Sequence, residues 1–479
     1  MTRQLRRYAT VFGVLWLLLL ANLTQIQVIG RDELRQQQGN TRILLQQFNH
    51  SRGAILVGSE PIATSTRPAG TNFYQRTYAD GSLYAPITGF YSLIYGATGL
   101  ERSANDILSG ADARFFVDRL QQLFAGRQSS GGTIRLTIDQ AAQRAAYNGL
   151  AGRAGAVVAI DPSTGAILAM ATSPSFDPQD LAPNDPTSVR TFYEALLNDD
   201  REPMLNRAIA RNYPPGSTFK LITAAAALAS GRFTADSVIP GPATYPLTNS
   251  NKQLRNWQGR ACTPSGKLTL QRALELSCNT AFAWLGNQVG ADALRSMAEQ
   301  FGFDQSFLVP MVAAASRFPL DPDEAQTAMS AIGQFDVRAS ALQMAIVAAA
   351  IANDGVVMQP FLIQDVLGPK LAVLERTQPK EYGTPLAANA ARMLADMMVG
   401  VVERGTASNA RIDGVRVGGK TGTAESGTDA APHAWFTAFA PGVAVAVVIE
   451  NGGGALEVSG NALAAPIARD VIRAVLANS

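Results

Sequence analysis

The chain has 479 residues, of which 47% are hydrophobic, and a formal net charge of only +2. This length suits two or three domains with a large core, and the near-neutral charge gives no indication of a nucleic-acid partner. With only two histidines, His50 and His433, and two cysteines, imidazole and thiolate metal sites are not favoured, so we expect no metal and no cofactor. A Ser-His-Asp triad would have to use one of the two histidines.

The first expected element is a membrane anchor. Residues 8–30 carry no charged side chain and follow three arginines within the first seven residues. A helix of this length can cross a hydrocarbon core of about 30 Å, and the basic flank favours a cytoplasmic N-terminus. A cleaved signal peptide is the alternative, although its apolar part is normally shorter and residues 21–24 (Ala-Asn-Leu-Thr) form a poor cleavage site. We therefore expect residues 1–30 to form a cytoplasmic tip and one uncleaved span, with the remaining chain exported.

Residues 31–130 form a polar segment, rich in Gln, Asn and Arg with short apolar runs. No grouping of acid, base and nucleophile stands out in it, so we favour a stalk, dimerisation or docking module over a second enzyme. The small residues 128–132 (Gln-Ser-Ser-Gly-Gly) are typical of a linker and place the next domain boundary near residue 130.

The segment 131–479 begins and ends with strand patterns. Residues 156–160 and 166–170 flank a turn and predict a hairpin. Three further strand patterns and a closing helix, capped by Asn461, are expected near the end of the chain, at 415–424, 434–440, 443–449 and 462–477. The alanine-rich stretch between these parts has helical periodicity. We therefore expect a five-stranded antiparallel sheet with an all-α lobe inserted into it.

The chemistry is expected to centre on residues 212–220, Asn-Tyr-Pro-Pro-Gly-Ser-Thr-Phe-Lys. The prolines and the glycine end any preceding element, and the run after them predicts a helix with Ser217 and Lys220 on one face of its first turn. A serine becomes nucleophilic when a base takes its proton, and a lysine kept neutral by burial or by a second cation can be that base. A Ser-x-x-Lys also occurs in capped surface helices, so the prediction depends on two later segments.

These later segments are Ser277-Cys278-Asn279 and Lys420-Thr421-Gly422. The first offers a hydroxyl and an amide for proton transfer and substrate binding, and the second offers a cation and hydroxyls for a carboxylate. In this order the three segments resemble the serine/lysine set of penicillin-binding proteins and β-lactamases, with Cys278 where many members have Asp.

The resemblance implies an α+β serine acyltransferase fold, with a five-stranded antiparallel sheet flanked by helices and an all-α lobe. Residues 52–55 (Arg-Gly-Ala-Ile) and 99–101 (Gly-Leu-Glu) resemble signatures of the strand-rich, non-catalytic module of class B penicillin-binding proteins. A single span, this module and too little chain for a glycosyltransferase domain place the sequence nearest to class B, and its short length resembles the actinobacterial members.

The resemblance also implies roles for individual residues. Lys220 takes the proton of Ser217, which attacks the carbonyl between two D-alanines of a peptidoglycan stem peptide, and Ser277 passes a proton to the departing D-alanine. The backbone N–H groups of Ser217 and Thr423 hold the oxyanion. The charge of Lys420 lowers the pKa of Lys220. The remaining residues bind substrate, through its amide or its terminal carboxylate: Asn279, Thr421, Gly422 and Thr423.

A second stem peptide would complete a cross-link for division or elongation, and a membrane glycosyltransferase partner would polymerise the glycan. Water in place of that amine would give a carboxypeptidase, and a dedicated water-activating base would give a β-lactamase. No Glu-x-x-x-Asn lies between Asn279 and Lys420, so β-lactams are expected to form a long-lived acyl-enzyme. A β-lactam sensor or a catalytically weak structural partner of the cell-wall complex remain alternatives; the first predicts further spans and the second a lost motif residue.

Two further expectations concern Cys262, Cys278 and His433. The cysteines are the only two of an exported chain, where pairs tend to be oxidised, so we expect a disulfide that fixes Ser277. Two buried thiols are the alternative. His433 precedes a strand and is expected at a strand edge or on the surface rather than as a base.

Overall fold

The computed structural model describes residues 2–26, 48, 50–71, 73–116, 124, 131–183, 185–249, 251–368, 370–425, 430–455 and 458–478. Helix α1 (Thr2–Thr24) includes an 18-residue window, Arg7–Thr24, that is apolar and long enough to cross a membrane, and none of that window is buried. It is the one helix of the described ranges that meets this test. The end of the expected span, residues 27–30, lies outside them, as do residues 128–130 of the expected linker.

The module that follows the anchor is built on a six-stranded sheet. Its strands, in order across the sheet, are β15 (Val373–Arg376), β14 (Ile363–Leu367), β6 (Thr133–Leu136), β1 (Ile55–Val57), β2 (Glu60–Thr66) and β3 (Gln75–Tyr78). Strand β6 pairs in parallel with β1 and antiparallel with β14. Three of the six strands therefore come from beyond residue 130, and the sheet crosses the expected domain boundary, which itself stays a prediction.

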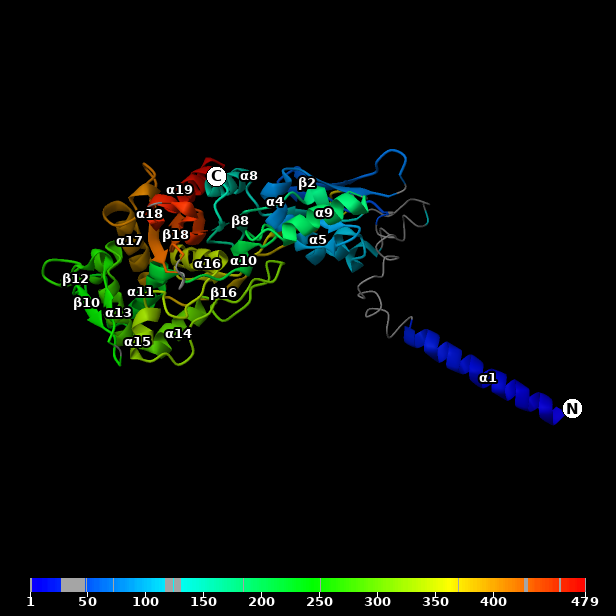
Figure 1. The fold of residues 1–479 in the computed structure, drawn as a ribbon, viewed down its shortest axis with the longest axis horizontal. Coiled ribbons are helices and arrows are strands. Elements are labelled where there is room, and N and C mark those ends of the chain that lie inside the picture. The colour runs from blue at the N-terminus through cyan, green and yellow to red at the C-terminus, as the bar shows by residue number, and fades with distance from the viewer. Residues whose placement is uncertain are drawn as a thin grey trace.

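Short elements complete the module. They are α4 (Gly81–Thr88), β4 (Tyr91–Ser92), β5 (Gly96–Ala97), α5 (Gly99–Ser103), α6 (Asn105–Leu108) and η2 (Ala113–Phe115). Figure 1 shows these elements gathered at the opposite end of the folded body from α13 and α15.

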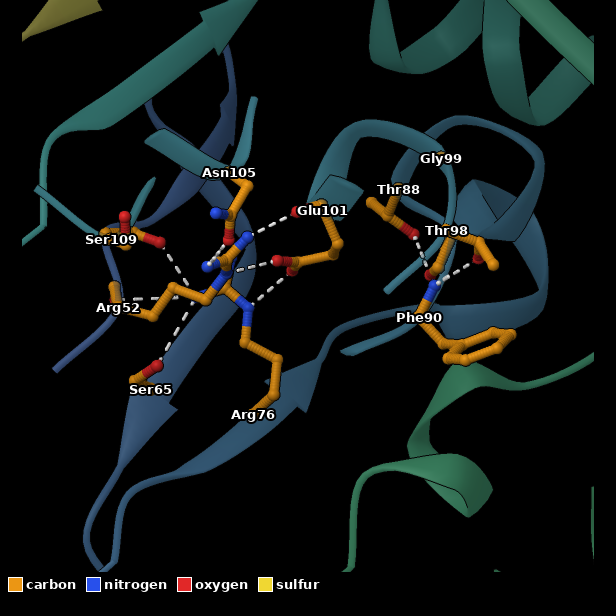
Figure 2. A network of polar contacts seen from close by, with 12 residues as sticks. Arg52, Ser65, Arg76, Thr88, Phe90, Thr98, Gly99, Glu101, Asn105 and Ser109 are labelled. Atoms are coloured by element: carbon orange, nitrogen blue, oxygen red, sulfur yellow. Dashed lines mark hydrogen bonds and ion pairs between the residues drawn. The ribbon is translucent and has the colours of Figure 1, made fainter. Parts of the chain in front are cut away.

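A buried ionic network joins residues 52–55 to residues 99–101, the two stretches of this module that resemble family signatures (Figure 2). Arg52 and Arg76 each donate from Nε to a different carboxylate oxygen of Glu101, both at 2.6 Å. Arg52 also donates to Asn105 at 2.9 Å, and its guanidinium lies 4.3 Å from the centre of the Tyr91 ring. Burial raises the pKa of Glu101, but the two arginines outweigh it and hold that pKa below its usual value. Both carboxylate oxygens of Glu101 are thus bonded to arginines within the module, which supports a structural rather than a chemical role for it.

Residues 131 and 132 do not form a free linker. The Gly131 N–H donates to the Ser51 carbonyl and the Gly132 N–H to the Ile107 carbonyl, both at 2.9 Å. A Cβ added to Gly53 would lie 1.8 Å from the Gly132 carbonyl oxygen, so the two backbones approach closely only because neither carries a side chain there. The linker prediction is thus wrong for these two residues, because their polar backbone groups bind the module.

The C-terminal part of the chain is organised around the expected five-stranded antiparallel sheet. Its strands run in the order β17 (Gly418–Ala424), β18 (His433–Ala440), β19 (Val443–Ile449), β7 (Gly155–Ile160) and β8 (Ile167–Ser173). All four pairings are antiparallel. The early hairpin and the three late strands are therefore confirmed. Their continuous apolar runs fit a sheet covered on both faces.

Helices cover both faces of this sheet (Figure 1). Helices α8 (Gln140–Leu150) and α19 (Ala465–Ala477) pack together on one side, and α16 (Ala341–Ala352) packs on β7, β18 and β19 on the other. Helix α16 is apolar and buried nearly all round, as expected for a helix enclosed in a core. The closing helix was expected as one piece, but a short α18 (Gly460–Leu463) precedes α19. Its cap is Ser459 and not Asn461, because the Ser459 hydroxyl accepts from the Ala462 N–H.

The inserted lobe is helical but not all-α. Its helices and those leading into it are α9 (Pro186–Leu197), α10 (Arg207–Ala210), α11 (Lys220–Ala229), α12 (Leu270–Glu275), α13 (Asn279–Val289), α14 (Ala291–Gln300), α15 (Glu324–Ser330) and α17 (Ala388–Arg404). It also holds three two-stranded sheets, β9 (Val238–Pro240) with β12 (Lys267–Thr269), β10 (Thr244–Pro246) with β11 (Gln253–Arg255), and β13 (Val357–Met358) with β16 (Glu381–Gly383). Strands of two or three residues are too short to show an alternating pattern in the sequence.

Candidate active site

Ser217 lies in η4 (Gly216–Phe219), a single 3-10 turn that leads directly into α11. The Gly216 N–H donates to the Gly333 carbonyl at 3.0 Å, and Gly216 itself adopts a positive φ of 52°. A Cβ at Gly216 would lie 2.9 Å from the Thr423 carbonyl oxygen, so the turn runs against strand β17. Ser217, the predicted nucleophile, and the predicted oxyanion donor of Thr423 thus belong to two adjacent backbone segments.

Lys220 begins α11 and is completely buried. Its Nζ donates to the Ser277 carbonyl at 2.7 Å and to Asn279 Oδ1 at 2.7 Å, and lies 3.3 Å from Ser277 Oγ. Within the described residues, the Ser217 hydroxyl has no hydrogen-bond partner, Lys220 included. The Ser-x-x-Lys and Ser-x-Asn segments are therefore joined through Lys220. The predicted contact between Ser217 and Lys220 is not among the hydrogen bonds of the described residues, and catalytic hydrogen bonds are often long before substrate binds.

Lys420 approaches the same serine from the opposite wall. Its Nζ donates to Ser277 Oγ at 2.8 Å and to the Thr421 carbonyl at 2.9 Å. The Ser277 hydroxyl thus lies between the amines of two lysines, and Ser277 adopts a left-handed φ of 53° that non-glycine residues rarely adopt. Such strain is typical of functional positions, where the surrounding contacts hold it in place.

The pKa values of both lysines are lowered. Burial lowers the pKa of Lys220 well below its usual value, and the nearby Lys420 lowers it further. Burial also lowers the pKa of Lys420, to about 7. Because two ammonium groups beside one hydroxyl repel each other, the arrangement favours a neutral Lys220, while Lys420 carries its charge increasingly as the pH falls below about 7.

Strand β17 forms the wall expected to receive a carboxylate. Thr421 is buried, Gly422 packs against Pro215, and Thr423 is exposed. The Thr421 hydroxyl lies 2.7 Å from the hydroxyl of Thr406, which follows α17. The structure therefore brings the residues chosen from the three segments together, and it adds Thr406.

A second group of residues, missed by sequence reasoning, anchors the segment before Ser217. The Tyr213 hydroxyl donates to Glu450 at 2.5 Å, and Arg207 donates to the same carboxylate oxygen at 2.9 Å. The indole of Trp435 donates to the Pro214 carbonyl at 2.9 Å. These contacts join residues more than two hundred positions apart, so no local pattern could have indicated them.

His433 is a buried structural residue at the first position of β18, not a surface one. Its ring packs edge-on against Tyr213, with centroids 5.3 Å apart, and its Nδ1 accepts from the Asn451 N–H at 3.1 Å. Burial lowers its pKa below the usual value, so the ring is neutral. His433 thus packs on Tyr213, which helps to hold the segment before Ser217, in keeping with the expectation that His433 is not the base.

Cys262 and Cys278 form a disulfide, with their Cα atoms 5.9 Å apart. Cys278 is buried and lies between Ser277 and Asn279, so the bridge ties the Ser277–Asn279 segment to the loop before β12. The chain-entropy model gives about 3 kcal/mol of stabilisation for closing a loop of this size.

We predict that the denatured, unreduced protein takes up no alkylating reagent, because both sulfurs are bonded. After reduction it should take up two alkyl groups, and the reduced native protein should be acylated more slowly by a penicillin, since Ser277 is then less firmly held. Intact-protein mass gives the first result and labelling kinetics the second. The variant Cys262→Ala is the control, because it removes the bridge without altering Ser277-Cys278-Asn279. Alkylation of two thiols before reduction would contradict the bridge.

Comparison with known proteins covers both parts of the chain. Residues 155–473 match the penicillin binding protein transpeptidase domain, and residues 52–134 match the penicillin binding protein A dimerisation domain. The peptidoglycan D,D-transpeptidase PbpA of Mycolicibacterium smegmatis is 45% identical over 489 residues, covering 99% of each chain. Its counterpart from Mycobacterium tuberculosis is 42% identical with the same coverage. The ceftriaxone acyl-enzyme structure of M. tuberculosis penicillin-binding protein A superimposes with a TM-score of 0.88 at 43% identity, covering 90% of this chain and 100% of that one.

Proposed function

Because this chain belongs to the penicillin-binding protein transpeptidases and is a peptidoglycan D,D-transpeptidase, we propose that Ser217 is the residue its stem-peptide substrate acylates. The observation that carries this proposal is the convergence of two buried lysines on Ser277, beside the turn that holds Ser217. This arrangement offers a neutral base, a proton carrier and a fixed cation at one point.

In the first step, neutral Lys220 accepts the Ser217 proton as Oγ attacks the carbonyl carbon of the penultimate D-alanine. The oxygen of that carbonyl gains negative charge and is held by the backbone N–H groups of Ser217 and Thr423. Loss of one such donor in comparable sites raises the barrier by about 3 kcal/mol. The close approach of Gly216 to the Thr423 carbonyl supports this pairing of donors.

In the second step, the C–N bond breaks and the departing D-alanine takes a proton from Ser277, which is replenished from the lysines beside it. The amine of a second stem peptide then attacks the ester carbonyl and releases Ser217, which gives the cross-link. A β-lactam enters the same first step, and its ring-opened acyl group stays on Ser217, because the described residues place no additional carboxylate base beside it.

Substrate binding is proposed for the flanking residues. Asn279 donates one N–H to the Arg255 carbonyl at 3.1 Å, which leaves the other for the amide of the donor peptide. The terminal carboxylate is proposed to lie against β17, where Lys420 supplies the charge and hydrogen bonds come from Thr421, Gly422 and Thr423. The catalytic group is thus Ser217, Lys220, Ser277 and Lys420.

We further propose that α1 anchors the chain by a single pass, with the catalytic part outside the cytoplasm. The basic flank and the apolar window Arg7–Thr24 support this topology. A membrane glycosyltransferase is the proposed partner for glycan synthesis during division or elongation. A β-lactam sensor is not favoured, because α1 is the one helix of the described ranges that is apolar and long enough to cross a membrane. A catalytically weak partner is not favoured, because every motif residue is present.

The rate constant for acylation by a penicillin is expected to follow a bell-shaped pH profile. Lys220 acts only when deprotonated, so the rate should rise with pH through its depressed pKa. Lys420 binds the carboxylate only when protonated, so the rate should fall as the pH passes its pKa of about 7. Labelling kinetics between about pH 5 and pH 10 test this.

The matched control for this profile is Lys420→Arg, whose guanidinium stays charged throughout and should remove the alkaline limb. A wild-type rate that still rises at the alkaline end would contradict the roles given to the two lysines.

A further inference from the structure

The stretch Gly405-Thr406-Ala407, which follows α17, contacts the carboxylate-binding wall. Thr406 Oγ1 and Thr421 Oγ1 are 2.7 Å apart, and in the described ranges neither hydroxyl has another hydrogen-bond partner. Thr421 is buried and belongs to the Lys-Thr-Gly segment, while Thr406 belongs to none of the three catalytic segments. At this distance one hydroxyl donates its proton to the oxygen of the other. The proton of Thr421 is free for a substrate only if Thr406 is the donor.

Thr406 is held firmly in this position. Its N–H donates to the Glu275 carbonyl at 3.2 Å, and the Ala407 N–H donates to the Val401 carbonyl at 3.1 Å. A Cβ at Gly405 would lie 2.4 Å from the Glu275 carbonyl oxygen, so only glycine fits at this position.

The side chain of Glu275 strengthens this attachment. It is buried, and it accepts from Arg272 at 2.8 Å and from Arg404 at 2.9 Å. Because Glu275 lies two residues before Ser277, the same contacts connect Thr406 to the proton-transfer segment. The backbone of Thr421 is also fixed, since its carbonyl accepts from Lys420.

We propose that Thr406 is a positioning residue that donates its hydroxyl proton to Thr421, so that Thr421 keeps its own proton for the substrate's terminal carboxylate. This inference rests on the proposed function, in which β17 receives that carboxylate. If Thr421 donated to Thr406 instead, its single proton would point at Thr406, and the lone pairs of the Thr421 oxygen would face the carboxylate. Accepting from Thr406 also polarises the Thr421 hydroxyl and makes it a stronger donor.

The effect is therefore specific for acyl donors that carry a carboxylate. Thr406→Val keeps the branched shape and removes the hydroxyl, and we expect it to lower the acylation rate constant for a penicillin by about tenfold, the scale of one charge-assisted hydrogen bond. Thr406→Ser keeps the donor and should remain within about twofold of wild type. The methyl ester of the same penicillin lacks the carboxylate charge and should react more slowly. Its acylation rate constant should be the same for the wild type, Thr406→Val and Thr406→Ser.

A double-mutant cycle with Thr421→Val tests whether Thr406 acts through Thr421. Adding Thr406→Val to Thr421→Val should cause no further loss, since the hydroxyl it orients is already gone. Thermal unfolding midpoints of the variants show whether the valine is tolerated, and Thr406→Ala provides a second variant without the hydroxyl.

Equal slowing of the free acid and the ester, a multiplicative double variant, or an unchanged rate in Thr406→Val would each overturn the inference, provided that peptide mapping still places the acyl group on Ser217. Acylation at another residue of the wild type would overturn the proposed function and this inference with it.

Discussion

Replacement of Ser217 by alanine should abolish covalent labelling by a penicillin. The hydroxyl oxygen is the atom proposed to form the ester. Ser217 lies in η4, directly before α11, and its neighbour Gly216 approaches the Thr423 carbonyl. Removing it leaves Lys220 without a proton to accept and the oxyanion donors without an oxyanion. Intact-protein mass after incubation should show one added penicillin on the wild type and none on the variant.

Ser277 makes this experiment a stringent one, because its hydroxyl also lies beside both lysines. The matched control is Ser277→Ala, which should still be acylated, though slowly, since only the proton transfer to the leaving group is lost. Full labelling of Ser217→Ala together with no labelling of Ser277→Ala would reverse the two roles.

Replacement of Lys220 by arginine should slow acylation by about a hundredfold or more, the usual contribution of general-base catalysis. The guanidinium stays protonated at every accessible pH, so it cannot accept the Ser217 proton. Stopped-flow or gel-based labelling with an excess of penicillin gives the rate constant, and the stoichiometry at long times shows whether the site is intact.

The control for Lys220→Arg is Lys420→Arg. A fixed charge at position 420 suits the proposed carboxylate site, so this variant should retain far more activity than Lys220→Arg. A rate for Lys220→Arg within roughly tenfold of wild type would rule out Lys220 as the base.

The proposed catalytic set could be chosen from the sequence because each segment is local. Ser217 and Lys220 are three residues apart, Ser277 and Asn279 two, and Lys420, Thr421 and Gly422 are consecutive. The five-stranded sheet could be predicted for the same reason, since its strands are long enough to show continuous apolar runs.

The remaining features depend on contacts between distant residues. The pairing of β14 with β6 joins strands about 230 positions apart, and the polar residues of β14 gave it no distinctive pattern. Thr406 and Glu450 likewise reach their partners only through the fold. Nor could the sequence show that the unliganded Lys220 is held by Ser277 and Asn279 rather than by Ser217.

The sheet that crosses residue 130 also limits how relatives of this chain can exchange parts. Strand β6 pairs with β1 on one side and with β14 on the other, so a genetic crossover at residue 130 would separate hydrogen-bonding partners. A hybrid made there would have to match a foreign β1 to β6 in register, or leave an open strand edge, which is a template for aggregation. We therefore expect recombination between relatives to transfer the module and the C-terminal part together, so that β1 and β6 come from the same parent.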